Sequence, residues 1–133
     1  MIKLTIPGEP VAKGRPRVTR YGTYTPEKTK NYETLVKELY FVEHGQTLLE
    51  GELKIEIKAY LRIPKSASKA KKTKMAKGVI RPTKRPDLDN LMKAVTDAIN
   101  GVAYEDDSQI VSATVEKYYS EEPRTEIKIE RID

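Results

Sequence analysis

Alternation between apolar and polar residues marks two segments in the first half of the chain as β-strands. Ile2, Leu4 and Ile6 alternate with polar residues and lead into turn residues. From Leu53 to Ile63 every second residue is apolar, which is the clearest strand pattern in the sequence. Neighbouring side chains on a strand point to opposite faces, so each segment can bury one face. We predict a strand at each position, with the second near the centre of a sheet.

Two other segments carry apolar residues at helical spacing. The first lies between Pro26 and Gly45, and the second begins near Leu88 and meets Asn100 followed by Gly101. Proline suits the first turn of a helix, whereas asparagine and glycine suit the residues just after its end. We therefore predict two helices with these bounds.

The last third of the chain carries two further strand patterns. The stretch "SQIVSATVEKYYS" has apolar or small residues on both sides, so we expect both of its faces to be covered. "TEIKIERI" follows the turn residues Glu122 and Pro123, which predicts a hairpin between the two strands. The order strand, helix, strand, basic loop at about 64–85, helix, strand, strand predicts an α+β fold. We expect one domain, residues 1–133, with helices packed on a mostly antiparallel or mixed β-sheet.

Basic residues are concentrated in two regions of the chain. The formal net charge is +5, and no acidic residue interrupts the bases between Arg62 and Arg85. Such regions predict a polyanionic partner, although a solvated lysine-rich loop is the alternative for the longer one. The residues that we predict to bind nucleic acid are Lys13, Arg15, Arg17, Arg20, Lys69, Lys71, Lys72, Lys74, Arg81, Lys84 and Arg85.

Residue types that are missing or rare narrow the chemistry. The chain has no cysteine, which excludes disulfides, thiolate zinc sites and thiol nucleophiles, and its one histidine, His44, makes histidine-based catalysis an unfavourable hypothesis. No apolar run approaches the roughly 18 residues needed to span a bilayer. Met1 leads directly into a strand pattern instead of a signal peptide. We expect a soluble, cytoplasmic protein.

Four aspartates flank the second predicted helix. Asp87 and Asp89 stand at its start, where one can be an N-cap and the other can favour the helix dipole. That structural role does not account for Asp106 and Asp107, which follow the same helix. If the chain runs back along the helix, these carboxylates converge, and their repulsion favours a hard divalent cation such as Mg²⁺. A metal ion among them would suit phosphodiester hydrolysis.

Lys93 lies four residues after Asp89 on the same predicted helix. One interpretation is an ion pair between the two, worth about 0.3 kcal/mol. The other is that its ammonium group stabilises negative charge on a scissile phosphate. Spacing alone leaves both interpretations open. Asp97, one turn further on, is expected to support Lys93 or to face solvent.

The stretch from Arg85 to Val111, "RPDLDNLMKAVTDAINGVAYEDDSQIV", closely resembles the signature of RusA-type Holliday junction resolvases. Their pattern is Asp-x-Asp-Asn at a helix start, a lysine on the helix, and an Asp-Asp pair before a glutamine and a strand. The early "GRPR" and "YTP" are similar to the opening of family members from Gram-positive bacteria and phages. The basic stretch between Ile63 and Arg85 is longer than in the shortest members.

The resemblance implies roles for the acidic residues and the lysine. It implies that Asp87, Asp89 and Asp107 are catalytic metal-binding carboxylates, with Asp106 as a further candidate ligand and Lys93 as the essential lysine. It also implies Mg²⁺, or Mn²⁺ in its place, and a homodimer that resolves four-way junction DNA by paired nicks in recombination and repair. The resemblance implies that the protein is encoded by a bacterium or by a prophage.

Two other function classes stay open at this point. A non-catalytic basic nucleic-acid-binding protein would show the same charge pattern. A PD-(D/E)xK nuclease would use Asp87 with one of three acid-x-lysine segments, which are 52–54, 56–58 and 126–128. Three such matches in one highly charged chain make that signal weak.

Overall fold

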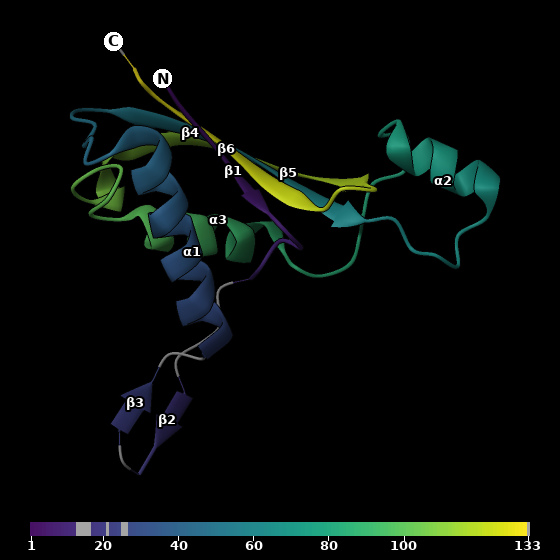
Figure 1. Cartoon of the computed structure of the whole chain (residues 1–133), viewed down its shortest axis with the longest axis horizontal. Helices are drawn as coiled ribbons and strands as arrows, with labels where there is room; N and C mark the ends of the chain where they lie inside the picture. Colours follow the sequence, from purple (N-terminus) through teal and green to yellow (C-terminus); the bar gives the residue numbers. More distant parts are fainter. Residues whose placement is uncertain (13–16, 21, 25–26, 133) are drawn as a thin grey trace.

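The structure is a computed structural model that describes residues 1–12, 17–20, 22–24 and 27–132 (Figure 1). Side chains are described for these residues except 17–19, 22–24 and 27–29. The elements in chain order are β1 (Ile2–Pro7), β2 (Arg17–Thr19), β3 (Gly22–Tyr24), α1 (Glu27–His44), β4 (Leu53–Arg62), α2 (Lys69–Ala76), α3 (Leu88–Ile99), the 3₁₀ turn η1 (Asp107–Gln109), β5 (Ile110–Ser120) and β6 (Arg124–Arg131).

A mixed four-stranded sheet forms the centre of the fold, in the order β1-β6-β4-β5. β4 pairs antiparallel with β6 and parallel with β5, so that Ile57 faces Ile127 on one side and Val115 on the other. The predicted α+β fold with a mixed sheet is confirmed. The interior position predicted for the strand within 52–63 is also confirmed. β2 and β3 form a separate two-stranded hairpin, which extends beyond the first turn of α1 (Figure 1).

Helices α1 and α3 cover the same face of the sheet (Figure 1). Their apolar residues meet the inward-pointing residues of the strands in one hydrophobic core, in which Val36, Val95 and Ile55 are fully buried. The alternation of β4 explains this arrangement, because its odd-numbered residues are buried whereas its even-numbered residues remain at least partly exposed. The helix pattern from Pro26 to Gly45 and the pattern that ends at Asn100 thus both identify real helices.

The hairpin predicted for the last two strands is wrong. β5 and β6 are joined by a short turn, but β4 lies between them and pairs with both. A turn signal shows that the chain reverses its direction, not that the strands on either side pair. β4 has an apolar residue at every second position and takes the interior place, which leaves β5 at one edge of the sheet.

The expectation that both faces of β5 are covered is wrong for the first half of the strand. Residues 111–114 are exposed, and Val111 retains 59% of its surface. Residues 115–120 are half-buried, because Val115 and Tyr119 pack against Leu91 of α3 and Arg81 reaches Lys117. The cause is the edge position of β5, which a sequence pattern does not reveal.

The basic stretch 64–85, expected as a loop, contains helix α2. Ser68 caps it by accepting a hydrogen bond of 3.3 Å from the backbone N–H of Lys71. Met75 is its one buried residue, which agrees with the absence of an apolar stripe in the sequence. α2 stands beyond the end of the sheet (Figure 1). Its lysines are exposed except Lys72, which is half-buried.

None of the helices formed by the described residues has the length and apolar character required to cross a membrane.

Candidate active site

Asp87 and Asp89 stand at the N-terminal end of α3. Asp87 is the N-cap residue, with extended backbone angles, yet its carboxylate makes no capping hydrogen bond. Asp89 lies in the first turn, and both side chains are exposed. The capping role that the sequence allowed for Asp87 is therefore filled by its position but not by its carboxylate. Its negative charge remains available to a ligand.

Lys93 is exposed on α3, beyond the first turn. The ion pairs of the described residues do not include one between Lys93 and Asp89, so the structural interpretation of their spacing gains no support. Asp97 is half-buried and is not without an interaction partner, so it does not simply face solvent.

The two aspartates of the acidic turn after α3, Asp106 and Asp107, differ in their hydrogen bonding. The carboxylate of Asp106 accepts hydrogen bonds from the backbone N–H and the hydroxyl of Ser108 and forms a capping box with Gln109. The side-chain bond from Ser108, followed by its backbone bond, lowers the pKa of Asp106. No hydrogen bond or ion pair engages the carboxylate of Asp107 in the part of the chain that the structure describes. Asp106 therefore shapes the turn, and Asp107 is the better candidate ligand.

Gln109 fixes this turn to the rest of the molecule. Its amide oxygen accepts hydrogen bonds from the backbone N–H groups of Glu105 and Asp106, at 3.0 and 3.1 Å. Its amide nitrogen donates to the carbonyl oxygens of Leu49 and Gly51, both at 3.1 Å. Both polar atoms of the side chain are thus in use, and the glutamine joins two chain segments beside Asp107.

Tyr104 keeps the acidic turn at the C-terminal end of α3. The ring is fully buried, and its hydroxyl donates a hydrogen bond of 2.7 Å to the carbonyl oxygen of Thr96. Burial, followed by the charge of Asp107, raises the pKa of Tyr104, so the hydroxyl stays protonated and able to donate. The backbone of Tyr104 also bridges to Asn100, the C-cap of α3.

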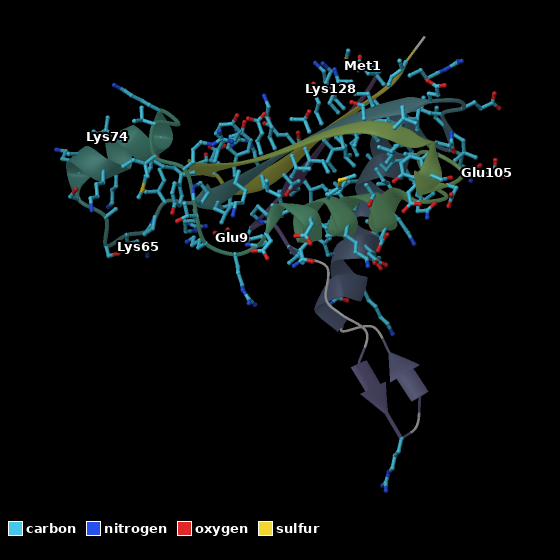
Figure 2. All side chains as sticks on the ribbon, turned by 180° about the vertical axis from the view of Figure 1, so that it is seen from behind. Met1, Glu9, Lys65, Lys74, Glu105 and Lys128 are labelled. Carbon is cyan, nitrogen blue, oxygen red and sulfur yellow. The ribbon has the colours of Figure 1, made fainter. Side chains whose placement is uncertain are left out.

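The two acidic groups consequently lie at opposite ends of α3 within one chain. The helix has 12 residues, which corresponds to a length of about 18 Å. The chain after α3 does not run back along the helix, and Glu105 lies at the end of the sheet away from Lys65 and Lys74 (Figure 2). No group of three acidic or histidine side chains among the described residues is arranged to hold a metal ion. A single chain therefore does not gather the predicted ligands at one point.

Lys117 is a residue of this region that the sequence did not suggest. It lies on β5, on the face that meets the helices, and its ammonium group donates hydrogen bonds to the carbonyl oxygens of Lys84 at 2.7 Å and Pro86 at 3.1 Å. These bonds fix the segment directly before Asp87 to the sheet. A lysine at an inward position of a strand, between Val115 and Tyr119, was the signal that could have identified it.

The predicted nucleic-acid-binding residues fall into three groups. Those of α2 and of the segment that follows it are on the side of the molecule where α3 begins, and all but the half-buried Lys72 are exposed. Arg17 is on β2 and the exposed Arg20 follows it. Lys13 and Arg15 lie outside the described residues. The basic residues nearest to Asp87 in the chain are Lys84 and Arg85, so positive charge adjoins the first acidic pair.

Two arginines and two tyrosines form a row on the open face of the sheet. The guanidinium carbon of Arg81 lies 4.3 Å from the ring centre of Tyr118, which stacks on Tyr60 at 5.4 Å. The guanidinium carbon of Arg124 lies 3.9 Å from the ring centre of Tyr60 on the far side. This row attaches the segment after α2 to the sheet, since Arg81 also donates a hydrogen bond of 2.8 Å to the carbonyl oxygen of Lys117.

The acidic residues that a PD-(D/E)xK site would require lie elsewhere. Glu56 and Lys128 form an ion pair of 3.9 Å on the open face of the sheet, opposite to the face that α3 covers. Glu126 is on the same open face and pairs with Arg124 at 3.0 Å. Asp87 is at the start of α3, on the opposite side of the sheet from Glu56 and Glu126, so the segments 56–58 and 126–128 do not form a common site with it.

Comparison with known proteins identifies the family to which the chain belongs. A protein of Bacillus subtilis (strain 168) described as "Uncharacterized protein YqaN" is 44% identical over 137 aligned positions, which cover 98% of this chain and 96% of the relative. Residues 7–130 match the family described as "Endodeoxyribonuclease RusA", and this region includes α3, the acidic turn, β2 to β5 and all of β6 except Arg131, whereas only Pro7 of β1 lies within it. The chain therefore belongs to the RusA family of endodeoxyribonucleases.

Proposed function

We propose that this protein is a Mg²⁺-dependent endodeoxyribonuclease that resolves four-way DNA junctions by paired, symmetric nicks, and that it acts as a homodimer. Mn²⁺ would serve in place of Mg²⁺. The family supports the hydrolysis of DNA, and the rest of the proposal depends on particular side chains.

The observation that carries the proposal is the state of three carboxylates. Asp87 sits at a helix N-cap without capping, Asp89 is exposed beside it, and Asp107 is left unengaged while Asp106 takes over the capping of its turn. A carboxylate that served only to cap a helix or a turn would accept hydrogen bonds from backbone N–H groups, and neither Asp87 nor Asp107 does so. Exposed carboxylates without partners are suited to bind a hard cation from solution.

The separation of these carboxylates favours a site that two chains share. Asp87 and Asp89 are at one end of α3 and Asp107 is beyond the other, about 18 Å of helix away. A second copy related by a two-fold axis can bring its Asp107 to Asp87 and Asp89 of the first copy. By the same symmetry, Asp107 of the first copy then reaches Asp87 and Asp89 of the second. Two equivalent sites in one dimer fit a substrate that is cut in two equivalent strands.

Lys93 and the basic surface complete the proposal. Bound Mg²⁺ would supply a Lewis acid and an activated water for phosphodiester hydrolysis. Lys93 is exposed on the helix that carries Asp89, and its ammonium group would stabilise negative charge on the phosphate. The lysines of α2, with Arg81, Lys84 and Arg85, would hold the phosphates of the junction arms.

The first experiment compares cleavage of a synthetic four-way junction and of linear duplex, each with Mg²⁺ and with EDTA. We expect symmetric nicks in the junction only, and none without the metal. Asp87→Asn should abolish cleavage and leave junction binding within about twofold, whereas the control Glu38→Gln, an exposed acid on α1, should leave both unchanged. Binding without cleavage by the wild-type protein would instead support a non-catalytic DNA-binding protein.

The shared site has a sharper test, which is a mixture of two inactive variants. In a mixed dimer of Asp87→Asn and Asp107→Asn chains, one shared site carries both substitutions and the other carries neither. The mixture should therefore regain single nicks, although each variant alone is inactive. If each site were built within one chain, every site in the mixture would carry a substitution and cleavage would stay absent.

A further inference from the structure

We infer that the free edge of β5 is the surface on which the second copy docks, with two β5 strands pairing antiparallel about a two-fold axis near Ala113. This inference deepens the proposed function, because it rests on the homodimer and names the surface that forms it.

The composition of this edge is the first argument. The run from Ser108 to Val115 contains no charged residue, in a chain of which 34% of the residues are charged. Its isoleucine, valines and threonine favour strands. An exposed edge strand normally carries charges or proline that prevent unwanted pairing. An uncharged first half of an edge strand, in an otherwise highly charged protein, indicates that this half pairs with a partner.

The backbone of β5 supplies the second argument. The carbonyl oxygen of Lys117 points away from β4 and accepts the hydrogen bond from Arg81. Residues two apart on a strand present their backbone groups to the same side, so those of Ala113 and Val115 also face the free edge. Within the described residues, no hydrogen bond engages these groups outside the β4–β5 pairing. They are available to a second strand.

Only a short part of the free edge of β5 is open to a second strand. The second half of β5 is occupied, because Arg81 covers the edge at Lys117. A register shift between Leu53 and Lys54 in the pairing with β4 marks a bulge at the start of the strand. The exposed residues 111–114 lie between these two features. This short window centres the contact near Ala113.

Charge complementarity indicates that the partner is another copy of this chain. In an antiparallel pair centred near Ala113, the turn with Asp106 and Asp107 of one copy lies level with the part of β5 around Lys117 in the other. Lys117 contacts the segment of Lys84 and Pro86, so the acidic turn of each copy meets positive charge. The same arrangement brings Asp107 towards the start of the other copy's α3, where Asp87 stands.

The absence of native cysteine permits a direct test by cross-linking. Directly opposed residues of an antiparallel pair have Cα atoms about 4.5–5.5 Å apart, which lies within the range for a disulfide. Under mild oxidation, Ala113→Cys should form a disulfide-linked dimer at least tenfold faster than Val42→Cys, a control on α1 that is 84% exposed. Equal rates for the two variants would overturn the proposed surface.

A second variant tests the same edge without a cross-link. Ala113→Pro removes an N–H that faces the free edge and no bond to β4, so the strand can tolerate it. Light scattering should detect dimers of the wild-type protein and monomers of this variant at the same concentration. Circular dichroism and thermal unfolding check that the variant is folded. A folded variant that still forms wild-type dimers would overturn the inference.

Failure of the inference can be distinguished from failure of the function. A wild-type protein that nicks junctions and dimerises through another surface overturns the inference and leaves the resolvase proposal in place. A protein that cross-links at Ala113→Cys and loses its dimers with Ala113→Pro, but cuts no junction with Mg²⁺, supports the inference and overturns the proposed activity.

Discussion

The ammonium group of Lys117 donates a hydrogen bond of 3.1 Å to the carbonyl oxygen of Pro86, the residue directly before Asp87. A second bond, to the carbonyl oxygen of Lys84, makes this lysine a brace between the sheet and the start of α3. Hydrogen bonds that involve a charged group are stronger than neutral ones, so the position of Asp87 depends on a residue far from it in the sequence.

Replacement of Lys117 should impair the metal dependence of cleavage more than the binding of DNA. Without the ammonium group, Lys117→Met leaves the segment before Asp87 free to move, and misplaced ligands bind Mg²⁺ less well. We expect the Mg²⁺ concentration for half-maximal junction cleavage to rise about tenfold or more, in line with the effect of removing a residue that supports metal ligands.

The control for this prediction is Lys58→Met, which removes an exposed lysine from the open face of the sheet. It should leave the Mg²⁺ dependence unchanged. Lys117→Arg should recover part of the effect, because it retains charge and donors. Equal Mg²⁺ dependence of Lys117→Met and wild-type protein would contradict a role for Lys117 in positioning Asp87.

Gln109 should be required for the shape of the acidic turn and for the stability of the fold. In Gln109→Glu, a carboxylate replaces the amide group that donates to the carbonyl oxygens of Leu49 and Gly51. A carboxylate oxygen, which cannot donate, then faces the two carbonyl oxygens. The free energy of unfolding, measured with urea, should fall by about 1–3 kcal/mol. Cleavage, measured where the variant is folded, should fall as Asp107 loses its support. Gln46→Glu, an exposed change outside any element, should cost less than about 0.5 kcal/mol.

The lysines of α2 should dominate the salt dependence of junction binding. Replacing Lys69, Lys71, Lys72 and Lys74 together with glutamine removes four ammonium groups that can neutralise phosphates. The slope of log affinity against log salt concentration should become shallower by up to about 0.9 for each phosphate of a duplex arm that is no longer neutralised. The measurement is a titration by fluorescence anisotropy at several salt concentrations.

A charge-matched control exists on the open face of the sheet. Replacing four lysines of this face with glutamine changes the net charge by the same amount, although none of them belongs to the basic stretch. These lysines are Lys3, Lys54, Lys58 and Lys128. They should reduce the salt slope much less. Equal effects of the two sets would show that net charge, and not α2, determines binding.

The stabilisation that the hydroxyl of Tyr40 provides should be lost at alkaline pH. Its hydroxyl donates a hydrogen bond of 2.6 Å to the carbonyl oxygen of Thr47, and burial raises its pKa. The folded state therefore retains the proton where the unfolded chain loses it, and stability falls as the pH rises above about 10. Tyr40→Phe should lose about 1 kcal/mol at neutral pH. The difference from the wild type should shrink at higher pH, as measured by urea unfolding between pH 7 and pH 11.

The sequence predicts the elements that carry the site because periodicity is a local property. The helix from Leu88 and the strand around Ile57 each bury one face, and their patterns of apolar residues record this directly. That Asp87, Asp89 and Asp107 are metal ligands stays a prediction, which the sequence makes by grouping them around one helix. The distance between them could not be predicted, because it depends on where the chain after Gly101 goes.

Long-range contacts determine the features that the sequence did not reveal. The route after α3 is fixed by the burial of Tyr104 and its bond to Thr96. The order of the strands depends on β4 entering between β5 and β6, which no turn signal records. Lys117 resembles any other lysine of a charged strand until its partners, the carbonyl oxygens of Lys84 and Pro86, are seen.

The length of α3 has a consequence for when the protein can damage DNA. If the acids at the two ends of this helix meet only across two molecules, a newly made chain that is still a monomer has no complete active site. Such a monomer cannot nick the chromosome that it contacts. Activity would then rise steeply with the number of molecules in the cell. A nuclease of this kind is kept harmless by dilution, without an inhibitor.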